Sequence, residues 1–140
     1  MWLPGGQTTQ TISVSPSSTT TYSVSYTLSG CSTFTTATVF VNPSPILTVN
    51  SSTICVGQSA TLTSAGATTY TWNTGSTLNP LTVSPLATTN YTVTGTTAGC
   101  TNTAVATVSV NPLPIVTVNS STICVGQSAT LTATGATTYS

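Results

Sequence analysis

Residues 42–70 read NPSPILTVNSSTICVGQSATLTSAGATTY and residues 111–139 read NPLPIVTVNSSTICVGQSATLTATGATTY, with 25 of 29 positions identical. The offset between these two segments also relates Cys31 to Cys100, without a gap. Units of solenoid proteins are usually shorter, about 20 to 45 residues. The repeat therefore predicts a string of small independent domains with a 69-residue period.

Asn-Pro pairs mark the edges of these domains. Proline removes a ladder donor and restricts the residue before it, so the recurring Val-Asn-Pro-x-Pro predicts a stiff linker. We expect residues 43–111 to be one complete repeat. Residues 1–42 are then the C-terminal part of a preceding repeat, and residues 112–140 are the N-terminal part of a following one.

The two partial repeats are complementary, because Trp2 stands almost where the equivalent of Trp72 belongs, with one inserted residue near Gly5 and Gly6. Two interpretations remain open. In one, the chain is a window of a much longer repetitive protein. In the other, it is a subunit whose ends are completed by strands of neighbouring copies, head to tail.

The composition excludes several classes of function. The 140 residues contain no Asp, Glu, Lys, Arg or His. Without Lys or Arg, no side chain can neutralise phosphates or attract anionic lipid, so we expect no nucleic-acid partner. The chain also lacks an apolar run of roughly 20 residues, so we expect no membrane insertion. General acid–base catalysis also lacks its usual groups, so we expect no enzyme. We expect no metal and no cofactor, because carboxylates are absent and the cysteines lack close pairs.

Threonine and serine dominate the remaining surface. Threonine is β-branched and favours extended backbone, so the chain should be all-β. In residues 43–111 we expect seven short strands, typical of a sandwich, over 46–50, 53–56, 59–63, 69–73, 81–84, 90–95 and 102–110. Period-two alternation places the following residues inward: Ala60, Leu62, Tyr70, Trp72, Leu81, Val83, Tyr91, Val93, Ala104, Ala106, Val108 and Val110. Leu62, Trp72, Tyr91 and Val93 should form the centre of the core.

The order of these features resembles an immunoglobulin-like domain. The segment GQSATLT over 57–63 looks like the second strand, and Trp72 takes the place of the core tryptophan on the third. LTVSP over 81–85, followed by Tyr91, is similar to the approach to a tyrosine corner. The resemblance implies tandem immunoglobulin-like β-sandwich repeats.

A closer resemblance is carried by four motifs in fixed order: Thr-Ile-Cys-x-Gly-Gln, Thr-Tyr-x-Trp, Ser-Pro-x-x-Thr-Thr-x-Tyr-Thr-Val and Gly-Cys-Thr-Asn. Together they are similar to the tandem Ig-like or PKD-like repeats of large secreted cell-surface adhesins of Bacteroidota. This resemblance implies an extracellular structural repeat of a filament, stalk or adhesin, whose partners are other copies of itself. The alternative is a carbohydrate-binding or adhesive module that contacts surface glycans.

Four cysteines stand at repeat-locked positions, which in small secreted domains predicts disulfides. We expect Cys55 to pair with Cys100, closing a loop worth roughly 4 kcal/mol in the chain-entropy model. Head-to-tail joining would place Cys124 equivalently to Cys55, and Cys31 of the next copy equivalently to Cys100. Free buried thiols and a link between neighbouring domains remain open. Asn50, Asn90 and Asn119 begin N-glycosylation patterns and are candidate glycan sites of a glycoprotein.

Overall fold

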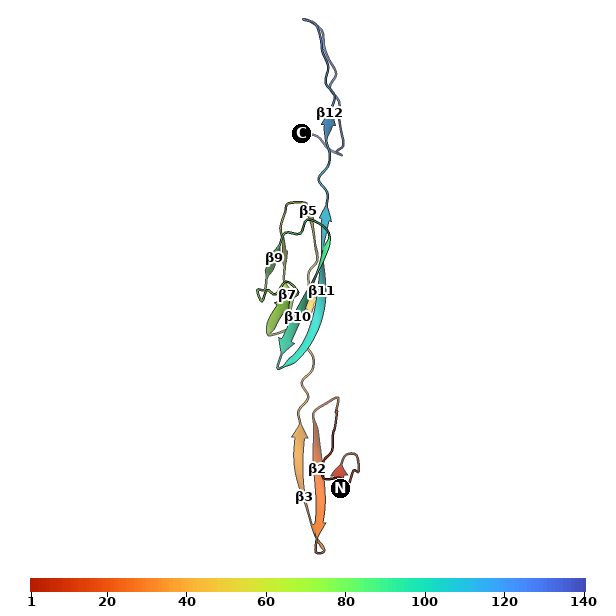
Figure 1. Cartoon of the computed structure of the whole chain (residues 1–140), viewed down its shortest axis with the longest axis vertical. Coiled ribbons are helices and arrows are strands. Elements are labelled where there is room, and N and C mark those ends of the chain that lie inside the picture. Colours follow the sequence, from red (N-terminus) through yellow and green to blue (C-terminus); the bar gives the residue numbers. More distant parts are fainter.

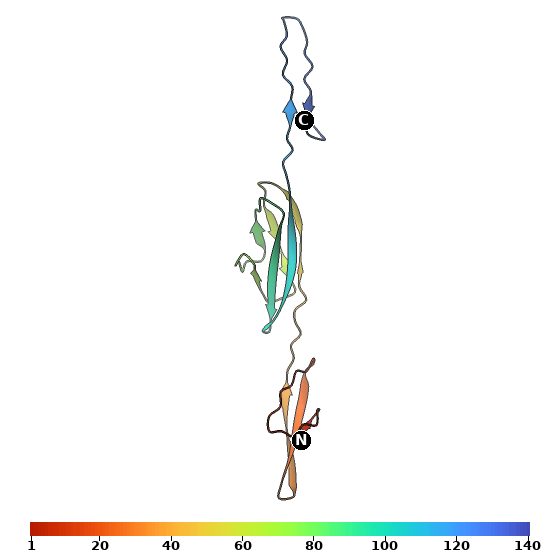
Figure 2. The same ribbon diagram turned by 45° about the vertical axis from the view of Figure 1, so that its right-hand side comes forward.

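The computed structural model describes all 140 residues and contains thirteen strands and no helix. The prediction of an all-β chain is confirmed, and the arrangement of its sheets is consistent with a β-sandwich. Three parts follow one another along one long axis (Figures 1 and 2). We call residues 1–42 the first segment, residues 43–111 the middle unit and residues 112–140 the third segment.

The first segment contains a single open sheet. In it, β1 (Trp2–Leu3) pairs with β2 (Thr20–Leu28), and β2 pairs with β3 (Cys31–Val39), all antiparallel. Tyr22 is the one buried residue of this segment. No second layer covers this sheet. Its strands alternate apolar and polar residues as in a sandwich, but the apolar side chains have no facing layer to pack against.

Trp2 takes the structural place of Trp72. Trp2 lies opposite Val24, and Trp72 lies opposite Val93, which is the counterpart of Val24 in the next repeat. Each indole nitrogen donates a hydrogen bond to a backbone carbonyl, that of Thr9 at 3.0 Å for Trp2 and that of Leu78 at 2.9 Å for Trp72. The one-residue insertion is thus absorbed in the turn that follows Trp2.

The middle unit holds eight strands, close to the predicted ones. They are β4 (Thr48–Val49), β5 (Ser52–Cys55), β6 (Ala60–Leu62), β7 (Ser64–Ala65), β8 (Thr69–Trp72), β9 (Leu81–Val83), β10 (Thr89–Thr97) and β11 (Cys100–Asn111). The single strand expected over 59–63 ends early, and β7 follows it. Between them Thr63 bonds to Asn50, whose Oδ1 accepts from the Thr63 amide at 2.6 Å.

Two layers form the middle unit (Figure 2). One is a four-stranded sheet in the order β5-β11-β10-β8, and the other consists of the ladders β4–β7 and β6–β9. All pairs are antiparallel except β5 with β11, which run parallel. Parallel neighbours need a long connection, and here the chain between them supplies the rest of the unit.

A single core lies between the two layers. Its nine buried residues are Ile54, Ala60, Leu62, Trp72, Leu81, Tyr91, Val93, Ala106 and Val108, with Val49, Tyr70, Val83, Ala104 and Val110 packed against them. Every residue that the alternation places inward belongs to one of these two sets. Burying one large apolar side chain is worth about 1.5–3 kcal/mol, so this core is the main source of stability.

The linker between the first segment and the middle unit is fastened to the end of the unit where β10 turns into β11. Asn42 Nδ2 donates to the Ala98 carbonyl at 3.3 Å, and Asn102 Nδ2 donates to the Pro45 carbonyl at 3.0 Å. Pro45 is buried, and the Leu47 side chain packs over Gly95. These contacts hold the entering chain against the base of the middle unit.

The third segment is a long hairpin with little packing. Its strands β12 (Thr117–Val118) and β13 (Ala133–Thr134) pair antiparallel, with Thr117 opposite Thr134. The middle unit has the same pairing at the equivalent positions, with Thr48 opposite Ala65. Every residue of the third segment is exposed except Ala136, which is half-buried.

Candidate assembly surfaces

The third segment exposes apolar side chains whose counterparts are buried in the middle unit. Leu131 is 65% exposed, whereas Leu62 is completely buried. Ile123 is 51% exposed, whereas Ile54 is 7% exposed. The sequences around these pairs are identical, so the difference comes from the strands that cover the middle unit and have no counterpart in residues 112–140.

The first segment shows the reverse deficiency. It contains the equivalents of β8, β10 and β11, namely β1, β2 and β3, but no equivalent of β4 to β7. Val39 is 37% exposed, whereas Val108, at the same place in the middle unit, is completely buried. Residues 12–14 correspond to β9 but form no strand. In the middle unit β9 pairs only with β6, and the first segment has no counterpart of β6.

The two deficiencies match each other. The third segment has the residues of β4 to β7, and the first segment has the residues of β8 to β11. In the middle unit these two sets meet through the pairs β5–β11 and β6–β9. A third segment of one chain and a first segment of another therefore carry the complete set of strands between them.

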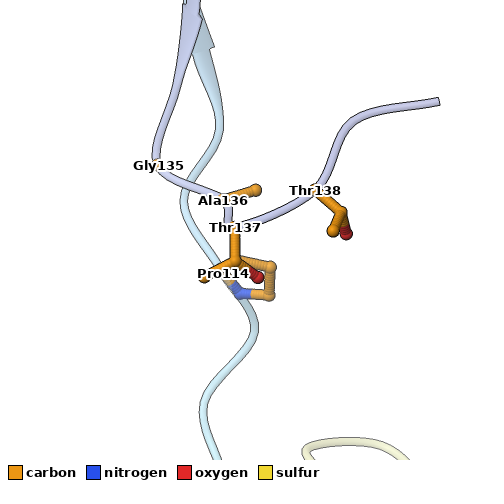
Figure 3. A pocket seen from close by; sticks show the side chains of 5 residues that line it. All are labelled: Pro114, Gly135, Ala136, Thr137 and Thr138. Atoms are coloured by element: carbon orange, nitrogen blue, oxygen red, sulfur yellow. The ribbon is translucent and has the colours of Figure 1, made fainter.

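The largest hollow of the protein lies at the base of the third segment. It measures about 580 Å³ and is lined by Pro114, Gly135, Ala136, Thr137 and Thr138 (Figure 3). In the middle unit the residue equivalent to Thr137 is Thr68, whose hydroxyl donates to the Thr96 carbonyl of β10 at 2.8 Å. In the middle unit, a strand of the β10 type thus lies within hydrogen-bond distance of this position.

The middle unit has its own shallow hollow beside β8. It measures about 490 Å³ and is lined by Thr68, Thr69, Tyr70, Thr71, Thr77 and Asn79. The lining offers hydroxyl and amide groups and one aromatic ring. These groups can form hydrogen bonds and stack against a flat ligand.

The four residues expected at the centre of the core all lie there. Leu62 and Val93 are completely buried, Trp72 is 2% exposed and Tyr91 is 8% exposed. The indole nitrogen of Trp72 donates to the Leu78 carbonyl at 2.9 Å, which satisfies its only polar atom. Neither aromatic ring presents a face for ligand stacking.

The predicted disulfide between Cys55 and Cys100 is wrong for this structure. Cys55 lies opposite Asn111, at the end of β11, whereas Cys100 is the first residue of that strand. At about 3.3 Å per residue, the length of β11 separates the two cysteines by roughly 35 Å. A disulfide needs Cα atoms within about 7 Å. All four cysteines are free, and Cys31, Cys55 and Cys124 are exposed while Cys100 is half-buried.

The three candidate glycan sites differ in their surroundings. Asn50 Nδ2 donates to the Thr61 carbonyl at 3.0 Å, and Asn119 Nδ2 donates to the Thr130 carbonyl at 3.1 Å. Both amides therefore fasten backbone. Asn90 uses only its oxygen, which accepts from the Thr107 hydroxyl at 2.8 Å. All three side chains are exposed, and Asn90 alone presents an amide nitrogen without a hydrogen bond.

Sequence reasoning missed Asn79, which is the main polar contact inside the middle unit. Its Oδ1 accepts from the Ser64 amide at 2.9 Å, and its Nδ2 donates to the Ser64 carbonyl at 2.7 Å. Ser64 is the one buried polar residue of the core region, 4% exposed. The Asn-Pro pair at 79–80 was the available signal, but we interpreted such pairs only as domain edges.

The structure contains no cluster of three or more side chains that could hold a metal ion. It also contains no helix long and apolar enough to cross a membrane. Comparison of the chain with models of protein families and with curated protein sequences finds no match.

Proposed function

We propose that the chain is a structural repeat segment of an extracellular bacterial surface filament, stalk or adhesin, built from tandem immunoglobulin-like sandwiches. The topology of the middle unit supports the immunoglobulin-like part. Its parallel pair β5–β11 extends the sheet of β10 and β8, while β4–β7 and β6–β9 form the opposite layer. The surface location rests on the resemblance of the four motifs to secreted adhesin repeats.

The observation that carries this proposal is the contrast between the complete unit and its two partial copies. Several side chains that are buried in the middle unit are exposed at the same positions of the flanking segments, as Leu62 and Leu131 or Val108 and Val39 illustrate. Open strand edges with exposed apolar faces pair readily with other chains. We infer that the third segment of one copy and the first segment of the next close into one sandwich, head to tail.

A fibre of this kind needs joints that keep its units in line. The linker supplies such a joint, because Pro43 and Pro45 restrict its backbone and Asn42 and Asn102 bond it to the base of the middle unit. The absence of charged side chains leaves hydroxyl groups to hydrate the surface. Both features favour a passive, extended role.

Assembly is tested by the size of the purified chain in solution, measured by light scattering and electron microscopy across a range of concentrations. The proposal expects unbranched filaments whose axial repeat equals two units. Leu131→Asp should abolish them, because the side chain enters the core of the joined sandwich. Ile115→Asp is the matched control. Ile115 is 82% exposed and its counterpart Ile46 in the complete unit is 84% exposed, so this charge should leave assembly intact. A chain that stays monomeric at high concentration overturns head-to-tail assembly.

A second candidate is glycan adhesion by the first segment. Phe34, in β3, and Phe40, the residue after that strand, are 74% and 78% exposed, and the middle unit has Thr103 and Ser109 at these positions. Exposed aromatic rings offer an apolar face on which sugars and other flat ligands can stack. Binding of the chain to a glycan array, lost in the double variant Phe34→Thr and Phe40→Ser, would favour this candidate.

A further inference from the structure

The two cysteines of the middle unit lie at its two ends, where the linkers join it. In the middle unit, β11 carries Cys100 at its start and lies beside Cys55 at its end. Each end of β11 is also where a linker joins. One cysteine therefore stands at the entrance of the unit and the other at its exit.

At the exit, Cys55 is next to the first residue of the following linker. Cys55 is the ladder partner of Asn111, and the amide of the next residue, Val56, donates to the Asn111 carbonyl at 3.0 Å. Asn111 precedes Pro112, with which the third segment begins. The Cys55 side chain is exposed at this point.

At the entrance, Cys100 is next to the first residue of the preceding linker. Its Sγ donates to the Asn42 carbonyl at 3.4 Å. Asn42 is the counterpart of Asn111, one repeat earlier in the chain. The carbonyl at this linker position therefore accepts a hydrogen bond from the residue after β5 in the preceding unit and from the first residue of β11 in the following unit.

In a continuous array of such units, both cysteines would lie at the same linker asparagine. We propose that a disulfide bridges each linker, between the cysteine that ends the β5-type strand of one unit and the cysteine that begins the β11-type strand of the next. Which cysteines meet follows from the proposed function. In a head-to-tail fibre, Cys55 bonds to Cys31 of a second copy, and Cys124 bonds to Cys100 of that copy. Consecutive chains are then joined by two covalent bonds.

The chemistry requires a disulfide oxidant, for which glutathione disulfide serves as the probe. The two thiols together give up two protons and two electrons, a sulfur–sulfur bond forms between them, and the oxidant's own disulfide is reduced to two thiols. The exchange passes through a mixed disulfide, which the second cysteine resolves. Exposure of Cys31, Cys55 and Cys124 gives the oxidant access to both thiols of the first pair and to one thiol of the second.

The test uses two full chains fused in tandem, so that the pairing is examined independently of assembly. In one fusion all cysteines become serine except Cys55 of the first copy and Cys31 of the second. Treatment with glutathione disulfide should give an internal disulfide, seen in the intact mass as the loss of two hydrogens. Glutathione adducts on both cysteines, without an internal bond, overturn the inference.

The matched control keeps Cys55 and Cys100 of the same copy. These thiols stand at opposite ends of β11 and should collect two glutathione adducts with no internal bond. An internal bond here also overturns the inference. Failure of the proposed function would give a different result. The wild-type chain would remain monomeric under reducing conditions, while the fusion would still form the Cys55–Cys31 bond. That outcome would overturn assembly but leave the linker disulfide standing.

Discussion

Leu62 and Leu131 stand at the same position of two nearly identical segments, yet the Leu62 side chain is completely buried and the Leu131 side chain is 65% exposed. The local backbone is also alike, since Asn50 donates to the Thr61 carbonyl and Asn119 donates to the equivalent Thr130 carbonyl. Burial of the leucine is therefore decided by strands that the third segment lacks, namely β9, whose Leu81 lies opposite Leu62, and the strands that supply the rest of the core. Without those strands, the third segment leaves its half of the core uncovered.

Replacing Trp72 by alanine should destabilise the middle unit by about 3–5 kcal/mol, because the ring fills the centre of a small core. Denaturant unfolding of the monomeric chain measures this free energy. Trp2→Ala is the matched control. Trp2 is half-buried in an open sheet, so its loss should cost clearly less. Equal costs for the two variants would show that the core does not depend on Trp72.

Gly95→Ala should loosen the joint between linker and middle unit. A Cβ added at Gly95 would lie 2.5 Å from Leu47 Cδ2 and 2.7 Å from Ala67 Cβ, so Leu47 must move out of its seat. Overpacking of this kind costs about 1–3 kcal/mol. Thr103→Ala, at an exposed position of the neighbouring strand, serves as the control and should change stability by no more than about 0.5 kcal/mol. Thermal unfolding compares the two, and an unchanged melting temperature for Gly95→Ala contradicts the packing argument.

Asn79→Ala should cost about 2–3 kcal/mol, because it removes two hydrogen bonds to the backbone of Ser64 and leaves a buried amide and carbonyl without partners. Asn90→Ala offers a comparison, because it removes one exposed bond to the Thr107 hydroxyl and should have little effect. Urea unfolding of both variants measures the difference, and a ranking in the opposite order would refute the role given to Asn79.

Stability should hardly depend on pH between about 4 and 7 or on moderate NaCl. The chain lacks Asp, Glu and His, the side chains that ordinarily change charge in this range, so folding is not linked to proton uptake there. Salt likewise finds no side-chain ion pairs to screen. Melting temperatures recorded across both ranges check this. A shift of more than a few degrees for the unmodified chain contradicts it.

Alternation alone was enough to identify these inward residues of the middle unit, because in most of its strands an apolar residue alternates with Thr or Ser. Ile54 was missed, since β5 offers only one buried position. Gly95 and Leu47 were missed because their contact joins a linker to a distant strand.

The positions of the cysteines relative to one another could not be predicted from the sequence for a related reason. Spacing told which cysteines are equivalent, but not that β5 runs parallel to β11 and so brings Cys55 beside the end of that strand. An antiparallel neighbour would have brought Cys55 toward Cys100. Direction between non-adjacent strands is set by the closed sandwich as a whole, and no local signal specifies it.

The parallel pair β5–β11 also determines how a pulled fibre would respond. The chain enters the middle unit through the linker below β5 and leaves through the end of β11, so tension along the axis drags these two strands in opposite directions past each other. Their ladder is then loaded in shear, with its hydrogen bonds sharing the force at once rather than opening one at a time. Single-molecule stretching should accordingly show abrupt, high-force rupture of each unit.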